Sequence, residues 1–148
     1  MAVFNKFECF IGDLGLKLHD LNTDTLKVYL TNELGCAGMT VYNDVSDAAD
    51  GPVEIVAENG YTAGGSDVSN TWSQTGGVGA LAIGDDIVLT GTAADDALGF
   101  GPFQFAVLYN DGAAAKNLIG WWERAGATTV LEDETITLDM TTNLLTIE

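Results

Sequence analysis

Few side chains suited to catalysis occur in this sequence, and none stands in a recognisable catalytic arrangement. His19 is the only histidine, and Cys9 and Cys36 form neither a C-x-x-C pair nor a metal-ligand spacing. A catalytic nucleophile needs a neighbouring base, and a metal needs ligands at set spacings. The G-x-S-x-G and H-E-x-x-H patterns are absent. We therefore expect no catalytic residue, metal or cofactor, a hydrogen-bonded structural His19, and two buried or half-buried thiols.

Carboxylates are the remaining groups that could carry chemistry, because Asp and Glu total 22. Two carboxylates suffice for glycoside hydrolysis and follow no spacing rule in sequence, so a hydrolase stays a minor alternative. The side chains of adjacent pairs such as Asp85 and Asp86 would point to opposite faces of a strand, so they could not act together as general acid and general base on one substrate. Asp44, Asp47 and Asp50 lack the glycine and terminal glutamate of a calcium loop. We expect them to form a solvated surface.

The net charge of −17 limits the partners of this protein. Such a surface repels phosphate, so we expect no nucleic acid and no membrane partner. Solubility is one interpretation of the charge, and an acidic outer face that keeps copies on an assembled particle apart is another. No run of eighteen apolar residues occurs, and Lys6 and Glu8 interrupt the apolar pattern at the start. We expect no signal peptide and synthesis in the cytoplasm.

The pattern best suited to binding is Trp121-Trp122 followed by Glu123 and Arg124. Neighbouring residues of a strand face opposite ways, so one tryptophan can fill the core while the other is exposed. Tryptophan and arginine are common anchors of protein interfaces. The exposed tryptophan would mark such an interface or, together with Trp72, a carbohydrate platform.

The tryptophan pair ends the second of two apolar runs, PFQFAVLY and NLIGWW, and these runs determine its position in the fold. They predict neighbouring buried strands in the middle of a sheet, because an exposed edge this apolar would invite aggregation. In the first run Phe103, Phe105, Val107 and Tyr109 would share one face. The stretch TLKVYLTN predicts a half-buried strand with one solvated face.

The whole pattern predicts a single domain, residues 1–148, of the mainly β class: a mostly antiparallel β-sandwich or β-barrel-like fold. Glycine and aspartate turns separate several short strands after residue 67. The spacing of Phe4, Phe7 and Phe10 predicts a short N-terminal helix over residues 3–12. Pro52, followed by a stop at Asn59-Gly60, predicts a second short helix near residues 52–58.

Several stretches together resemble a family of small structural proteins of tailed bacteriophages. They are, in order, FNKFECFIGDLGLKLHDLNTDTLKVYLTN, ENGYTAGG, GPFQFAVLYND, LIGWWERAGATTVL and EDETITLDMTTNLLTI. The resemblance covers most of the chain apart from residues 33–50 and 67–96. Where the family pattern GPFRYAVLYND has an arginine, this chain has Gln104, so a charge contact there is not carried over.

The resemblance implies a non-enzymatic virion protein, made in the host cytoplasm, that decorates and stabilises the outer face of the phage head. Its partners would be the major capsid protein and copies of itself in a homo-oligomer. A tail or head-tail connector subunit is the alternative within virions, and a carbohydrate-binding β-sandwich module is the alternative outside them. We expect contacts from residues 1–10 and 121–124, with these candidate interface residues: Phe4, Phe7, Phe10, Trp121, Trp122 and Arg124.

Overall fold

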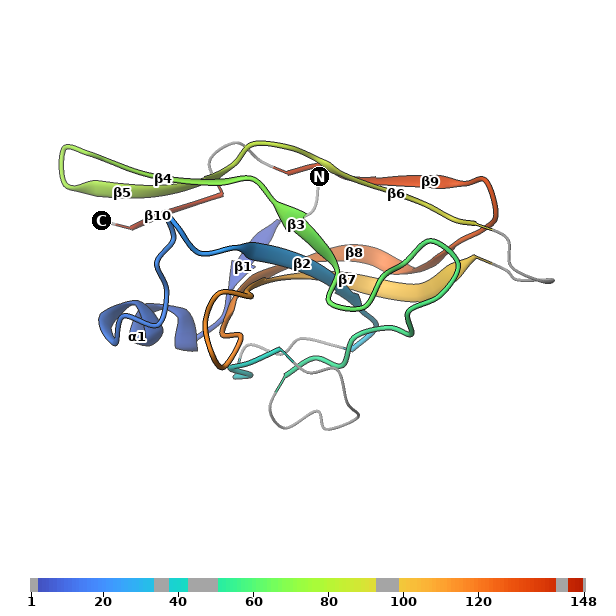
Figure 1. The fold of residues 1–148 in the computed structure, drawn as a ribbon, viewed down its shortest axis with the longest axis horizontal. Coiled ribbons are helices and arrows are strands. Elements are labelled where there is room, and N and C mark those ends of the chain that lie inside the picture. The colour runs from blue at the N-terminus through green and yellow to red at the C-terminus, as the bar shows by residue number, and fades with distance from the viewer. Residues whose placement is uncertain (1–2, 34–37, 43–50, 93–98, 141–143, 148) are drawn as a thin grey trace.

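Ten strands and one short helix form the part of the chain that the computed structural model describes, residues 3–33, 38–42, 51–92, 99–140 and 144–147. Every pairing between named strands is antiparallel. One layer is a five-stranded sheet with the order β1-β8-β7-β2-β3. The second layer holds the sheets β10-β5-β4 and β6-β9, which lie over the first (Figure 1). The predicted mainly β, mostly antiparallel sandwich is confirmed.

The large sheet is built around the two long apolar strands. These are β7 (Phe100–Asn110) and β8 (Leu118–Val130), and β2 (Leu26–Thr31) flanks β7 on its other side. The short strands β1 (Phe4–Lys6) and β3 (Ser66–Val68) lie at the two edges. The apolar runs therefore lie inside the sheet, as predicted from the need to cover them.

Shorter strands, separated by polar turns, form the second layer. One sheet contains β4 (Asn70–Thr75), β5 (Val78–Ile83) and β10 (Leu145–Ile147). The other contains β6 (Ile87–Thr90) and β9 (Thr135–Leu138). The Gly76-Gly77 turn closes the β4–β5 hairpin with both glycines at positive φ, which residues with a side chain rarely adopt.

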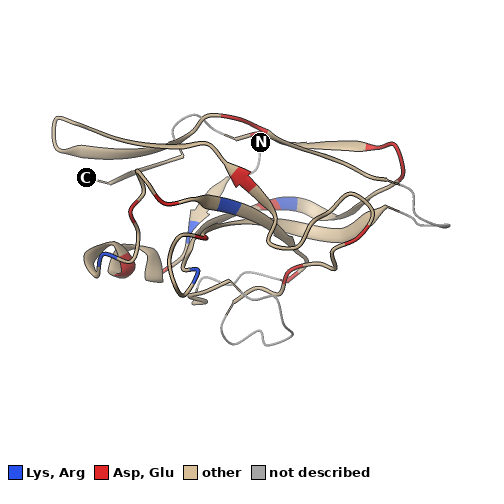
Figure 2. Cartoon of the chain, in the orientation of Figure 1, with Lys and Arg blue, Asp and Glu red and all other residues tan. Residues whose placement is uncertain are grey.

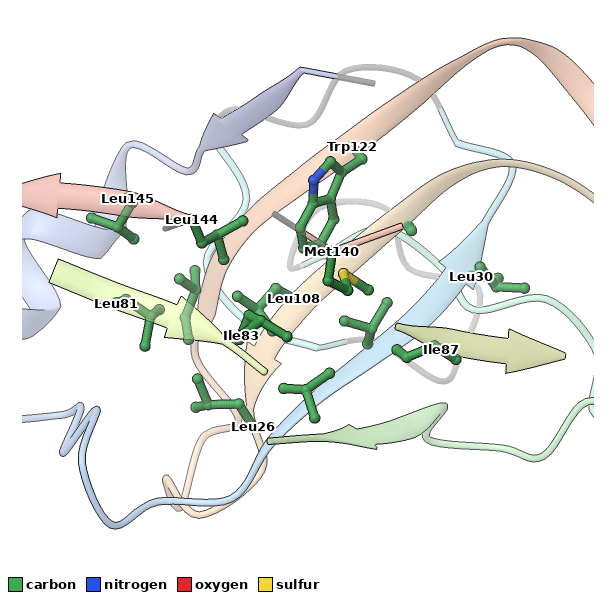
Figure 3. Close-up of a cluster of buried hydrophobic side chains, with 14 of the residues drawn as sticks. Leu26, Leu30, Leu81, Ile83, Ile87, Leu108, Trp122, Met140, Leu144 and Leu145 are labelled. Atoms are coloured by element: carbon green, nitrogen blue, oxygen red, sulfur yellow. The ribbon is translucent and has the colours of Figure 1, made fainter. Parts of the chain in front are cut away.

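The main core lies between the two layers. Alternate residues of each strand point into it, so both layers contribute one apolar face. Figure 3 shows this cluster, with labelled side chains from both layers: Leu26, Leu30, Leu81, Ile83, Ile87, Leu108, Trp122, Met140, Leu144 and Leu145.

A second, smaller core covers the outer face of the large sheet. Phe7, Tyr29, Val107, Tyr109 and Leu118 are buried there. Residues 39–42 pack against this cluster, and residues 51–55 run beside β2. The prediction that one face of the strand at residues 26–31 is solvated is therefore wrong, because a distant segment of the chain covers that face.

The face of the sheet to which the odd-numbered residues of β7 point changes along the strand. Phe103 belongs to the main core, whereas Val107 and Tyr109 belong to the outer one. The register of β7 with β8 shifts between Phe100 and Phe103 and again between Phe103 and Phe105. These irregularities turn the start of β7 relative to its end, so the expected common face of Phe103 and Tyr109 is wrong.

The N-terminal helix starts later than predicted. Phe4–Lys6 is the edge strand β1, and the helix α1 covers Cys9–Gly15. Backbone hydrogen bonds to β8 hold β1 extended, with Phe4 opposite Trp122. Local spacing alone could not reveal this pairing, because the partner strand lies more than a hundred residues further along the chain.

The predicted helix at residues 52–58 is wrong. The segment is extended, with a bridge between Thr31 and Glu54. The Tyr29 hydroxyl donates to the Pro52 carbonyl at 2.8 Å, and the Thr31 hydroxyl donates to the Val53 carbonyl at 2.6 Å. Side chains of β2 thus take the carbonyls that a helix would use internally. The predicted turn at Asn59-Gly60 is present, with both residues at positive φ.

Candidate interaction surface

The structure brings together the two segments expected to make contacts. Strand β1 pairs with β8, and the Phe4 and Trp122 rings lie 5.0 Å apart between centroids. On the opposite face of the sheet, the Phe7 and Trp121 rings lie 4.7 Å apart. Phe10 lies elsewhere, with its ring 5.4 Å from that of His19. The two aromatic pairs Phe4–Trp122 and Phe7–Trp121 stabilise the packing of the N-terminal segment against β8.

Burial divides the six candidate residues into two groups. Phe7, Phe10 and Trp122 are 2%, 0% and 8% exposed, so their rings are occupied inside the protein. Phe4 and Trp121 are half-buried, and Arg124 is exposed. The tryptophans do face opposite sides of β8, one packed in each core, as the alternation of a strand predicts. Of the six candidates, Arg124 therefore has the side chain most open to a partner.

A groove of about 310 Å³ lies beside Arg124, between the two layers. Phe103, Ala106, Trp122 and Met140 contribute apolar surface to it. From the second layer, the consecutive residues 136–140 line it. Successive side chains of a strand point to opposite faces of the sheet. Consecutive residues can therefore line one groove only where the groove runs along the edge of the strand. Strand β9 has only β6 as a neighbour among the described strands, and its other edge is unpaired.

Arg124 stands at the mouth of this groove because of a bulge in β8, which the alternation of a regular strand does not predict. Phe103 pairs with Thr128 and Phe105 with Glu123, so residues 124–127 of β8 lie opposite Gln104 alone. The Gln104 amide donates to the Glu123 carboxylate at 3.1 Å. Gly126 lies within these unpaired residues and is a local sign of the irregularity.

Arg124 is the only arginine of the sequence. Like Lys6 and Lys17, it makes no ion pair with any described residue, whereas Lys27 and Lys116 lie within 3.6 Å of carboxylate oxygens of Asp67 and Asp111. Figure 2 shows how few basic residues interrupt the acidic loops and strand ends. An exposed arginine beside an apolar groove and a strand edge is suited to recognition of another protein.

His19 belongs to a buried polar cluster away from the groove. Its Nδ1 lies 3.2 Å from Asn110 Nδ2, which donates to Asp24 at 2.6 Å. Its Nε2 lies 3.9 Å from Asp13 and finds no hydrogen-bond partner among the described residues. Asn117 also donates to Asp13, at 3.0 Å. Burial lowers the pKa of His19, and Asp13 and Asp24 oppose that shift. The predicted hydrogen-bonded imidazole is confirmed.

The Cys9 thiol is half-buried, as predicted, and Cys36 lies outside the described residues. Burial, reinforced by Asp13, raises the pKa of Cys9 to about 11. The thiol is therefore protonated at neutral pH, and the thiolate is the form that attacks electrophiles. Cys9 shows no sign of activation as a nucleophile.

The remaining expectations concern metals, membranes and relatives. Asp44, Asp47 and Asp50 lie outside the described residues, and within the described ranges no three His, Cys, Asp or Glu side chains group in a way that could hold a metal ion. No helix in the described part of the chain is long and apolar enough to cross a membrane.

No known protein family, curated protein or solved structure matches the chain.

Proposed function

We propose that this chain is a non-enzymatic structural protein of a virion that binds the outer face of a phage head as a decoration protein. The observation that carries this proposal is an edge of β9 that pairs with no described strand, beside an apolar groove with the exposed Arg124 at its mouth. The resemblance of the sequence to small virion proteins of tailed phages supports the same conclusion.

Binding would use the edge of β9 and the groove together. An extended segment of the major capsid protein adds to β9 by main-chain hydrogen bonds, and one apolar side chain enters the groove. Arg124 then pairs with a carboxylate at the rim of the contact. A stable contact of this kind buries about 800 Å² on each partner. The remaining acidic surface keeps neighbouring copies apart.

A tail or head-tail connector subunit is the alternative within virions. The same edge would then contact another copy of the chain, and a head-to-tail contact that closes on itself generates a ring. Particle location separates the two proposals, because a decoration protein covers the head while a connector sits at one vertex or in the tail.

The test uses heads purified without this protein, to which variants are added and co-sedimented. Thr137→Trp places a large ring in the groove from an exposed position of β9, and we expect binding to weaken at least tenfold, which corresponds to about 1.4 kcal/mol. Thr75→Trp is the control, because Thr75 is exposed on β4 and lies neither on β9 nor in the lining of this groove.

We also expect heads with the wild-type protein to withstand heating better than heads without it. The decoration proposal fails if the wild-type protein does not sediment with heads. It also fails if particles that lack the protein have intact, heat-resistant heads but no tails, which is the result that the connector alternative predicts.

A further inference from the structure

We propose that a second groove, between the β4–β5 hairpin and the connection from α1 to β2, binds a neutral hexopyranose. This inference is independent of the proposed binding to a phage head. The hairpin and α1 lie at the same end of the molecule (Figure 1), away from the groove beside Arg124.

The groove has the size and the mixed lining of a ligand site. Its volume is about 450 Å³, within the range of roughly 300–1,000 Å³ that is typical of small-molecule sites. Apolar surface comes from Leu14, Leu21, Trp72 and Ile147, and the polar lining consists of the buried His19 and, at the rim, the exposed Lys17, Asp20 and Asn22. An apolar wall with a few polar groups around it matches the two kinds of surface on a pyranose, whose C–H groups and hydroxyls lie on different sides.

Trp72 supplies the apolar wall from strand β4. A Cβ atom at Gly79 would lie 2.4 and 2.5 Å from two carbons of the indole, so the ring lies directly over this glycine. Ile147 of β10 pairs with Gly79 on the other side of β5. The ring is half-buried and lines the groove, so part of it is open to a ligand. The electron-rich face of an indole attracts the weakly positive C–H groups of a sugar.

The polar groups at the rim have unused hydrogen-bonding capacity. Neither the Lys17 ammonium nor the Asn22 amide makes a side-chain hydrogen bond or ion pair with a described residue. Asp20 Oδ1 accepts from the backbone N–H groups of Asn22 and Thr23, at 3.1 and 3.2 Å, which holds the carboxylate in place. The rim thus offers donors and acceptors together, as sugar hydroxyls require.

Charge decides between a neutral and an acidic sugar. The charged side chains that line the groove are one ammonium, Lys17, and one carboxylate, Asp20, so the groove itself has no excess charge. The chain as a whole carries −17 and repels anionic sugars. A purely apolar ligand would leave the rim groups unused, whereas a neutral hexopyranose uses both the indole and the rim.

The test titrates the full chain with the methyl glycosides of glucose, galactose, mannose and N-acetylglucosamine, followed by NMR of backbone amides and indole N–H groups. For at least one of them we expect saturable shifts at Trp72 and Asn22, with a dissociation constant of about 1 mM. Trp72→Ala and Asn22→Ala should each weaken binding at least tenfold. Asn22 is exposed on a connection, so its variant keeps the fold.

Ser73→Ala is the matched control, since Ser73 is exposed, adjacent to Trp72 on β4 and on the opposite face of the strand. Its affinity should equal that of the wild type. The proposal is overturned if none of the four glycosides shifts these signals at ten times the expected dissociation constant. It is equally overturned if the shifts persist unchanged in both Trp72→Ala and Asn22→Ala.

Discussion

At the scale of single residues, Asn110 explains why a buried histidine is tolerated. Its Nδ2 lies near the Leu18 carbonyl, His19 Nδ1 and Asp24 Oδ2, and its Oδ1 accepts from the Ala113 N–H. The amide donates to the unprotonated Nδ1 of a neutral imidazole. A proton on Nδ1 would place two donors face to face at 3.2 Å. Geometry and burial therefore favour the same neutral form.

The first prediction concerns the stability of this cluster below neutral pH. Because burial lowers the pKa of His19, the unfolded chain takes up the proton first as the pH falls through 6.5. The contribution of His19 is complete above that pH and is lost as the pH falls toward the folded-state pKa. Each unit of pKa difference corresponds to about 1.4 kcal/mol. The protonated imidazole would be attracted by the carboxylates of Asp13 and Asp24, and this attraction limits the loss of stability.

Urea unfolding of the wild type and of His19→Gln, at pH 7.5 and at pH 5, measures this effect. The difference between the two proteins removes the contribution of the carboxylates that both share. We expect wild type to lose stability relative to His19→Gln on acidification. A difference that stays constant with pH would show that His19 has the same pKa in the folded and unfolded chain.

The second prediction concerns Glu54. Its carboxylate accepts from the Tyr61 hydroxyl at 2.6 Å, from the Tyr42 hydroxyl and from the Gly64 N–H at 2.8 Å. Glu54→Gln replaces one acceptor oxygen with a donor, so one partly buried donor loses its partner. We expect a loss of about 1–3 kcal/mol in the free energy of unfolding.

Glu58→Gln is the control for Glu54→Gln, because Glu58 is exposed and lies in the same segment. Its effect should stay within about 0.5 kcal/mol. Equal losses in the two variants in urea unfolding would mean that the carboxylate of Glu54 does not hold this segment in place.

At the scale of elements, β1 depends on the absence of a side chain at Gly120. A Cβ atom there would lie 2.2 Å from a ring carbon of Phe4 and 2.5 Å from the Asn5 carbonyl oxygen. The backbone oxygen cannot move without breaking the pairing of β1 with β8. The edge strand and its aromatic contacts therefore share one steric requirement.

The third prediction follows from this contact. Gly120→Ala forces β1 away from β8, and we expect a loss of about 1–3 kcal/mol, the usual cost of overpacking. Gly126→Ala on the same strand is the matched control, because a Cβ there meets nothing within 4 Å. Thermal unfolding and amide exchange at residues 4–6 measure the effect. Protected β1 amides in Gly120→Ala would contradict it.

At the scale of the whole molecule, charge opposes the folded state. Acidic residues outnumber basic ones by 22 to five, and Figure 2 shows the acidic residues spread around the described chain. Folding brings these charges closer together, and their repulsion lowers stability. The two cores must therefore offset a repulsion that depends on the ionic strength.

The fourth prediction is that salt stabilises the protein. Between about 0.01 M and about 1 M NaCl the Debye length falls from about 30 to about 3 Å. We expect the Tm to rise by about 2–4 °C for each kcal/mol of repulsion screened. Neutralising the exposed Glu58, Asp85 and Glu132 as amides should raise the Tm at low salt and reduce its salt response. A Tm that is flat or falls with salt would contradict this account.

The sequence by itself determined the class of fold. The apolar runs of β7 and β8 cannot remain exposed, and the glycine and aspartate turns end the strands wherever they fall in space. The period of two also predicts that Trp121 and Trp122 face opposite sides. These properties depend on neighbouring residues, so they can be predicted before any partner strand is known.

Only the tertiary structure decided which segments meet. Residues 4–6 and 52–58 look helical, and partners from β8 and β2 hold them extended. Nothing local predicts that Arg124 stands beside the edge of β9, or that Trp72 lies over Gly79. Backbone pairing and ring contacts between distant segments contribute more free energy than local propensity, so both candidate sites follow from the folded chain.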